Sequence, residues 1–328
     1  MLADDRPGNV NQALAVAEAL GWPFTVKSIA YGALARLPNA LLGASLLGLG
    51  AASRDALVPP WPELVIAAGR RTAPVARWLK RRQPAALVLQ LMWPGSARGH
   101  DLVVVPAHDE RAEQAGVLGI AGTPHRITPQ RLAQAARALA PRLQDLPRPY
   151  IACLVGGSTR HTRFTRGDAL ELARQANTLA RGLGGSLLVT TSRRTGEVCA
   201  AALARAIARP RLLHEFAPAG DNLYLGLLGA ADVIIVTADS ASMCAEACGS
   251  GKPVFLFRPA AGASAKLTRL HRWLAQAGHL RPLGAPWPQR CPPPLNPAAS
   301  VAAAIRERLL GPIGAASAAA VASAPRTP

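Results

Sequence analysis

The residues with the clearest chemical potential lie in the segment 233–254. An apolar run over 233–237 precedes a polar turn, which predicts a strand followed by a helix. Ser240 and Ser242 stand at the expected helix start, where backbone N–H groups bind anions such as a diphosphate. Glu246 follows in that helix, and its carboxylate can accept hydrogen bonds from both hydroxyls of a ribose. The alternative is an ordinary strand–turn–helix unit with a capping serine.

A turn of small residues provides a second candidate anion site. It follows the predicted strand 150–155 and consists of Gly156, Gly157 and Ser158. Glycine lets a backbone approach a phosphate without a Cβ in the way. Directly after it come the basic residues Arg160, His161 and Arg163, which would neutralise a diphosphate leaving group or form a solvated loop. The turn matches neither GxGxxG nor GxxxxGK[ST], which disfavours hydride transfer and P-loop hydrolysis.

The first half of the chain contains candidates for binding an acceptor, the molecule whose hydroxyl would receive a transferred group. A proline–glycine turn and an arginine pair after a predicted strand supply its candidates: Pro7, Gly8, Asn9, Gln12, Arg70 and Arg71. A general base needs a carboxylate or imidazole within hydrogen-bond reach of the acceptor hydroxyl. Asp109 and His108 are the first choices because they follow the predicted strand 102–105, and His125 is the reserve. The alternative for each is an inert surface side chain.

No metal or cofactor motif accompanies these residues. The sequence contains no DxD triplet, no HExxH and no zinc pattern among its cysteines. We therefore expect no metal and no cofactor. If a nucleotide sugar binds, helix termini and arginines would compensate its charge.

The alternation of predicted strands and helices indicates an α/β protein with parallel sheets. The length suits two domains, 1–147 and 148–297, followed by a helix over 298–312 that returns to the first domain and a disordered tail over 313–328. Only residues 1–3 precede the first predicted turn. Either the first strand is very short, or the sequence starts inside it.

The net charge is +18, from 37 basic and 19 acidic residues. This charge favours contact with nucleoside diphosphates and anionic membranes. Nucleic-acid binding is disfavoured because aromatic residues are few and no basic helix is present. The longest uncharged run, 37–53, is too short and too broken to span a membrane. We expect a cytoplasmic protein, in keeping with unpaired cysteines, peripheral on the inner face of the inner membrane.

Six ordered segments resemble the mitochondrial fission ELM-type family, which is grouped with glycosyltransferases and has also been labelled as nucleoside-diphosphate-sugar epimerases. The segments lie at 5–12, 37–43, 68–72, 105–109, 155–158 and 236–253. The last one contains Asp239, Ser240, Ser242, Glu246 and Lys252. The second half is also similar to the donor domain of GT-B glycosyltransferases. That resemblance implies a glycine turn facing the donor diphosphate and a ribose held by Glu246.

The resemblance implies a GT-B-like α/β fold, with two Rossmann-like domains whose parallel sheets face a central cleft. It implies a metal-independent bacterial glycosyltransferase that moves a sugar from a nucleoside-diphosphate sugar to an acceptor hydroxyl, such as that of a cell-envelope glycolipid. The alternatives are a GT-B-shaped nucleotide-sugar 2-epimerase and a non-catalytic protein that binds nucleotide sugars as a scaffold. Nothing in the sequence itself indicates a role in fission.

Overall fold

The computed structural model describes residues 1–308 except 108, 110, 112, 113, 161 and 219. The chain forms two compact units, Met1–Arg126 together with the chain from Asn296, and Ile127–Leu295. The boundary lies before the one expected at 147, because the helix Pro129–Leu139 packs within the second unit. The predicted tail, 313–328, lies outside the described residues.

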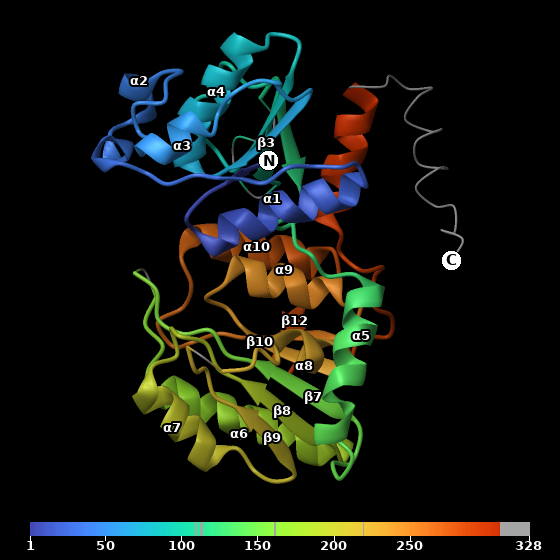
Figure 1. Cartoon of the computed structure of the whole chain (residues 1–328). Helices are drawn as coiled ribbons and strands as arrows, with labels where there is room; N and C mark the ends of the chain where they lie inside the picture. Colours follow the sequence, from blue (N-terminus) through green and yellow to red (C-terminus); the bar gives the residue numbers. More distant parts are fainter. Residues whose placement is uncertain (108, 110, 112–113, 161, 219, 309–328) are drawn as a thin grey trace. The chain divides into compact units, whose positions relative to one another are not determined.

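The first unit is built on parallel strands (Figure 1). Its elements are β1 (Leu2–Ala3), α1 (Pro7–Leu20), β2 (Lys27–Ser28), η1 (Ala33–Arg36), α2 (Asn39–Leu42), α3 (Ala51–Asp55), β3 (Leu64–Ala68), η2 (Arg70–Thr72), α4 (Ala73–Arg82), β4 (Leu87–Leu91), β5 (Leu102–Pro106) and β6 (Val117–Ile120). Strands β3, β4, β5 and β6 form one sheet in that order, and β1 pairs separately with β2.

Both faces of the first unit's sheet are buried, as parallel sheets require. One face carries Ile66 and Leu89, which pack against α1 and the helical residues 297–308. The other face carries Val65 and Val88, which pack against α4. Residues 297–308 are thus part of the first unit's core, although they follow the second unit in the sequence.

The second unit is a six-stranded parallel sheet in the order β12-β11-β10-β7-β8-β9. Its elements are α5 (Pro129–Leu139), η3 (Ala140–Arg142), β7 (Tyr150–Leu154), α6 (Arg166–Leu183), β8 (Ser186–Thr190), α7 (Glu197–Ala206), β9 (Arg211–His214), α8 (Tyr224–Ala230), β10 (Val233–Thr237), α9 (Ala241–Gly249), β11 (Val254–Phe257), α10 (Ala265–Gln276) and β12 (Arg281–Pro282). Figure 1 shows β7, β8, β9 and β10 side by side.

The strand order of the second unit reverses between β7 and β10. From β7 the chain adds β8 and β9 on one side, then returns to add β10, β11 and β12 on the other. At such a switch point the loops that leave two neighbouring strands diverge, and ligands bind outside the carboxyl ends there. The predicted α/β class with two Rossmann-like, parallel-sheet units is confirmed.

Helices α5 and α8 pack closely in the second unit because α8 has glycine at the contact. A Cβ built on Gly229 would overlap with the backbone carbonyl of Leu132 in α5, whereas one built on Gly182 in α6 meets nothing within 4 Å. Close approach of α8 matters for the site, since α8 begins at Tyr224.

We expect Gly229→Ala to destabilise the protein by about 1–3 kcal/mol, because α5 and α8 would have to move apart. Gly182→Ala is the matched control, and we expect it to stabilise the protein by about 0.5–1 kcal/mol through the higher helix propensity of alanine. Urea unfolding followed by circular dichroism measures both. Equal effects of the two substitutions would contradict the packing role of Gly229.

Candidate functional site

The loops after β7 and β10 meet at the switch point of the second unit. The backbone N–H of Gly157 donates to Asp239 Oδ2 at 3.0 Å, and that of Gly156 donates to Thr237 Oγ1 at 2.8 Å. Two segments that are some eighty residues apart in sequence are thus joined at one sheet edge. The structure brings together the glycine turn and the 239–246 segment, both of which the sequence had singled out.

Asp239 is the centre of this junction. Its side chain is 1% exposed, and it accepts hydrogen bonds from the hydroxyl of Thr237 at 2.6 Å and from Gly157 N–H. Arg194 completes the set with an ion pair of 2.8 Å from Nη2 to Asp239 Oδ2. A buried carboxylate is tolerated only with such compensation, so the three donors explain how Asp239 stays in the interior.

Contacts within the protein require both glycines of the turn. A Cβ on Gly156 would overlap with the Asp239 carboxylate, and one on Gly157 would overlap with the backbone carbonyl of Arg194. Ser158 N–H donates to that same carbonyl at 3.0 Å. All three amides of the turn therefore donate within the protein, and the glycines allow close approach of protein groups.

The first turn of α9, unlike the glycine turn, has backbone amides that donate to no protein acceptor among the described residues. Ser240 is the N-cap, and its hydroxyl accepts the N–H of Met243 at 3.3 Å. Across the described part of the chain, the amides of Ala241 and Ser242 have no protein acceptor. Ser240 and Ser242 are both half-buried. This helix start is therefore the place in the predicted donor site where an anion can be bound by backbone groups.

Glu246 lies on the same helix, six residues beyond Ser240 and hence about 9 Å further along its axis. It is half-buried, and its Oε2 accepts the hydroxyl of Tyr224 at 2.7 Å. Its Oε1 has no protein partner among the described residues. Burial raises the pKa of Glu246, and the hydrogen bond from Tyr224 opposes that rise. Burial also raises the pKa of Tyr224, so its hydroxyl remains a donor.

Arg194 and Tyr224 contact the candidate site residues Asp239 and Glu246, although the sequence did not indicate either of them. Arg194 follows β8, at the same edge of the sheet as the glycine turn, and its side chain is 34% exposed. The position after a strand could have revealed Arg194, as it did for Arg70 and Arg71. Tyr224 gives no such signal, because it precedes β10 and reaches Glu246 only through the packing of α8.

The remaining donor-side candidates are placed apart from this junction. Lys252 precedes β11, at the amino end of the strands, and its Nζ donates to the carbonyls of Leu228 at 2.8 Å and Gly229 at 2.7 Å at the end of α8. Burial lowers the pKa of Lys252 to about 8. Arg160 and Arg163 are exposed in the loop after the turn. His161 lies outside the described residues.

The acceptor-side candidates form contacts of their own within the first unit. Pro7 and Gly8 form the first turn of α1 rather than a loop, because proline at N1 needs no hydrogen-bonded N–H. Gly8 meets no neighbour that would require glycine. Asn9 is buried and donates to Asp4, while Gln12 is half-buried on α1.

Both candidate arginines of the acceptor side, Arg70 and Arg71, are bound to protein groups. Arg70 donates to the carbonyls of Ala35 and Leu37 and to Asn39 Oδ1, holding η1 and α2 beside β3. Arg71 forms ion pairs with Asp4 and Asp5, and its guanidinium lies 4.2 Å above the Tyr31 ring.

The base candidates are only partly described. Asp109 follows β5, is half-buried, and its N–H donates to the carbonyl of Pro106 at 2.8 Å. His125 is buried. His108 lies outside the described residues. Within the described ranges, no group of three or more histidine, cysteine, aspartate or glutamate side chains is arranged to hold a metal ion.

Removing the carboxylate at the junction tests its structural role. We expect Asp239→Ala to destabilise the protein by about 2–4 kcal/mol, because Gly157 N–H and Arg194 lose a buried acceptor. Asp221→Ala removes an exposed partner of Arg142 and should cost less than about 1 kcal/mol. Urea unfolding of both variants measures the difference, and similar values would show that Asp239 does not hold the loops together.

Solved structures with a similar fold include UDP-GlcNAc 2-epimerases. The enzyme from Methanocaldococcus jannaschii aligns with a TM-score of 0.55 and 11% identity over 94% of this chain and 99% of that one. The enzyme from Neisseria meningitidis, solved with UDP-GlcNAc, aligns with a TM-score of 0.50 and 13% identity over 94% and 98%. At these identities the likeness shows the fold, which is of the GT-B type.

Sequence relatives give the family. An uncharacterized protein of Rickettsia prowazekii is 26% identical over 294 residues, which cover 79% of this chain and 82% of the relative. The mitochondrial fission protein ELM1 of Arabidopsis thaliana is 27% identical over 300 residues, covering 82% and 69%. A family model described as Mitochondrial fission ELM1 matches residues 7–309. Because that match spans most of the sequence, the chain belongs to the Mitochondrial fission ELM1 family.

Proposed function

We propose that this protein is a metal-independent glycosyltransferase whose second unit binds a nucleoside-diphosphate sugar. The observation that carries the proposal is the arrangement along α9. Its first turn has unpaired amides at Ala241 and Ser242, and Glu246 keeps one carboxylate oxygen without a protein partner. An anion site and a hydroxyl acceptor about 6–8 Å apart along the axis of one helix suit the diphosphate and ribose of one nucleotide.

In this proposal the diphosphate binds at the start of α9, beside Arg194. A guanidinium has five N–H donors, and Asp239 engages only Nη2 of Arg194, so other donors are available to a phosphate. The ribose hydroxyls donate to Oε1 of Glu246, while Tyr224 fixes Oε2. As the bond from sugar to phosphate breaks, the charge on the leaving diphosphate is stabilised by the α9 amides and Arg194.

In this proposal the first unit binds the acceptor. We propose Asp109 as the general base, with His108 and His125 as the other candidates, and a cell-envelope glycolipid as the acceptor. A peripheral position on an anionic membrane surface is supported by the +18 charge and by apolar surface on the first unit. Most exposed large apolar side chains of the described residues lie in that unit: Phe24, Val26, Leu34, Leu37, Leu41, Leu47, Val58 and Met92.

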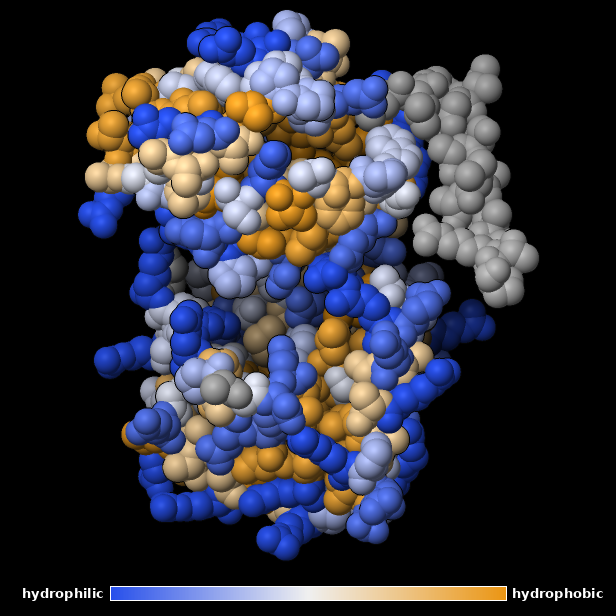
Figure 2. Space-filling view, in the orientation of Figure 1, coloured by the Kyte–Doolittle hydropathy of each residue, from blue (hydrophilic) through white to orange (hydrophobic). Residues whose placement is uncertain are grey.

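Figure 2 shows part of this apolar surface gathered around α2. No helix among the described residues is long and apolar enough to cross a membrane.

Two alternatives share the nucleotide site. The UDP-GlcNAc 2-epimerases among the structural neighbours favour testing epimerisation, in which the sugar is returned on the same nucleotide. A non-catalytic protein would bind the nucleotide sugar unchanged. Incubation with labelled nucleotide sugars and envelope extract separates the three outcomes, since transfer releases nucleoside diphosphate, epimerisation changes only the sugar, and a scaffold yields no product.

We expect Glu246→Ala to weaken binding of UDP or GDP by about 1–3 kcal/mol, from the loss of hydrogen bonds to a carboxylate. Glu197→Ala is the control, because Glu197 is an exposed glutamate at the start of α7. Isothermal titration calorimetry on both variants measures the affinities. Unchanged affinity of the Glu246 variant would remove the ribose assignment.

Arg194→Met tests the diphosphate contact. We expect it to lower affinity for a nucleoside diphosphate at least roughly ten-fold, with a much smaller effect on the free nucleoside, because only the phosphates engage the guanidinium. Arg193→Met is the matched control, since Arg193 is the exposed neighbour in the same loop. Because Arg194 also pairs with Asp239, thermal melting of each variant must accompany the titrations. Equal losses for nucleoside and diphosphate would argue against this contact.

A further inference from the structure

A lobe formed by residues 33–47 leaves the first unit and returns to it at one point. Tyr31 and Leu49, on either side of the lobe, pair in an antiparallel bridge, and the N–H of Gly32 donates to the carbonyl of Gly48 at 2.9 Å. The lobe contains η1 and α2 and lies at the outer edge of the unit (Figure 1). Compact surface loops whose ends are joined in this way are frequently functional.

The lobe is held in one conformation by polar contacts with the rest of the first unit. Arg70 donates to the carbonyls of Ala35 and Leu37 in the lobe. Asn39 is buried and donates to the carbonyls of Arg70 and Pro94, both at 2.8 Å. Arg70 follows β3 and Pro94 follows β4, so the lobe is fixed to the carboxyl ends of these strands. A surface that is already ordered loses little conformational entropy when it binds.

Leucine side chains project from this ordered lobe into solvent. Leu41 and Leu47 are 71% and 58% exposed, and Leu34 and Leu37 are exposed as well. Figure 2 shows apolar residues gathered at α2, the helix that contains Leu41. Single exposed leucines are ordinary in proteins, but a group of them on one short segment marks an interaction surface.

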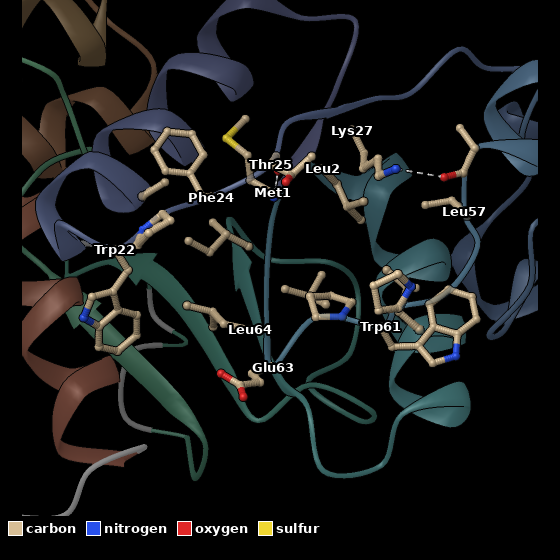
Figure 3. A pocket seen from close by; sticks show the side chains of 18 of the residues that line it. Met1, Leu2, Trp22, Phe24, Thr25, Lys27, Leu57, Trp61, Glu63 and Leu64 are labelled. Carbon is tan, nitrogen blue, oxygen red and sulfur yellow. Dashed lines mark hydrogen bonds between the residues drawn. The ribbon is translucent and has the colours of Figure 1, made fainter.

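A second group of exposed apolar side chains in the first unit has a different shape. Phe24 and Val58 line a cavity of about 970 Å³, together with Trp22 and Trp61 (Figure 3). Their apolar surface lines a hollow, whereas the leucines of the lobe project. A broad partner such as a bilayer meets projecting side chains before it can reach the lining of a hollow. The lobe and the cavity can therefore be tested separately.

The charge around the lobe is of one sign. Between residues 19 and 54 the sequence contains no acidic residue, and its basic residues are Lys27, Arg36 and Arg54. Arg36 is exposed in η1, within the lobe. An arginine beside exposed leucines matches the surface of an anionic bilayer, where lipid phosphates lie next to hydrocarbon. The charge and the projecting shape together favour a bilayer over a groove on a partner protein.

We propose that the lobe inserts Leu41 and Leu47 into the hydrocarbon of an anionic membrane, with Arg36 at the lipid phosphates. The membrane contact rests on the lobe alone, and its link to catalysis rests on the proposed function. Because the lobe is fixed to the carboxyl ends of β3 and β4, its insertion would bring that edge of the sheet to the lipid head groups. Asp109 follows β5 in the same sheet, so the hydroxyl of a glycolipid would reach the proposed base there.

Sedimentation of the full chain with vesicles of phosphatidylcholine and phosphatidylglycerol tests the membrane contact. We expect the double substitution of Leu41→Ser and Leu47→Ser to weaken vesicle binding at least roughly ten-fold, because two leucine side chains no longer enter the hydrocarbon. Both side chains are exposed, so the substitutions remove little packing within the protein. Thermal melting checks that the variant is folded.

Two matched double variants serve as controls. Leu170→Ser with Val198→Ser removes exposed apolar side chains from α6 and α7 of the second unit. Phe24→Ser with Val58→Ser removes them from the cavity. We expect both controls to bind vesicles as the parent protein does. Equal losses in all three variants, or no loss in the lobe variant, would overturn the proposal.

The charge and the depth of insertion are measured separately. Arg36→Gln should weaken binding to the anionic vesicles roughly five-fold and leave binding to pure phosphatidylcholine unchanged. A polarity-sensitive dye attached to Leu41→Cys, in a Cys291→Ser background that removes the exposed native thiol, should shift to shorter wavelength when vesicles are added. The same dye on Val198→Cys should not shift. An unshifted dye in the Leu41→Cys variant would place the lobe outside the hydrocarbon, and the proposal would fail.

Affinity for UDP or GDP, measured without vesicles, separates the membrane contact from the nucleotide site. We expect the lobe variant to keep the parent affinity, because Leu41 and Leu47 lie in the first unit. Vesicle binding through the lobe without any nucleotide binding would support the membrane contact and remove the proposed glycosyltransferase. Nucleotide binding without any vesicle binding would do the reverse, and a partner protein would then be the occupant of the lobe.

Discussion

The arrangement of the candidate site depends on the buried carboxylate of Asp239. A charge in the interior must be compensated, and here the compensation comes from three neighbouring strand ends, through Thr237 at the end of β10, Gly157 after β7 and Arg194 after β8. Each loop is therefore held at a fixed distance from the others. The helix α9 begins at Ala241, two residues after Asp239, so the contacts of Asp239 also fix the position of its unpaired first amides.

This arrangement also explains how an anion can bind close to a carboxylate. Asp239 carries a negative charge, but that charge is already matched by Arg194 and the two hydrogen-bond donors. The guanidinium is planar and its donors point in several directions, so it can contact Asp239 on one edge and a phosphate on another. Asp239 thus orients the cation instead of repelling the ligand. The glycine turn contributes because Gly156 has no Cβ and lets the Asp239 carboxylate approach the backbone.

Structure that depends on neighbouring residues was predictable from the sequence, whereas contacts that depend on the packing of distant elements were not. The strand, turn and helix around Ser240 were predictable because apolar runs and capping residues act over a few positions. The glycine turn was recognised, but its contacts with Asp239 and Arg194 were not, since a glycine accommodates protein and ligand equally well. The contact of Tyr224 with Glu246 could not be predicted, because it requires α8 and α9 to pack with a specific register.

The domain boundary and the position of Lys252 also depend on packing. The sequence around 147 contains prolines that suggested a linker, yet α5 joins the second unit because Gly229 admits its backbone. Lys252 is only six residues after Glu246 in the sequence. Between them, however, α9 returns the chain from the carboxyl ends of the strands to their amino ends. Lys252 therefore stands at the amino ends of the strands, on the carbonyls of α8. Sequence proximity is a poor guide to position when a helix separates two residues.

Both units have an aspartate, a glycine and an arginine in contact at the carboxyl ends of their strands, although the sequence shows no repeat. In the first unit Asp4 follows β1, lies against Gly69 after β3 and pairs with Arg71 at 3.2 Å. In the second unit Asp239 follows β10, lies against Gly156 after β7 and pairs with Arg194 at 2.8 Å. Both carboxylates are almost fully buried, with side chains 2% and 1% exposed.

The two arginines nevertheless differ in how much of their charge is engaged. Arg71 serves two carboxylates, Asp4 and Asp5, and stacks on Tyr31. Arg194 forms one ion pair and is more exposed, at 34% against 20%. A new anion at Arg71 would have to displace Asp5 or share its cation, whereas at Arg194 it meets donors that no carboxylate engages. The same aspartate–glycine–arginine arrangement therefore favours anion binding in the second unit and a neutralised surface in the first.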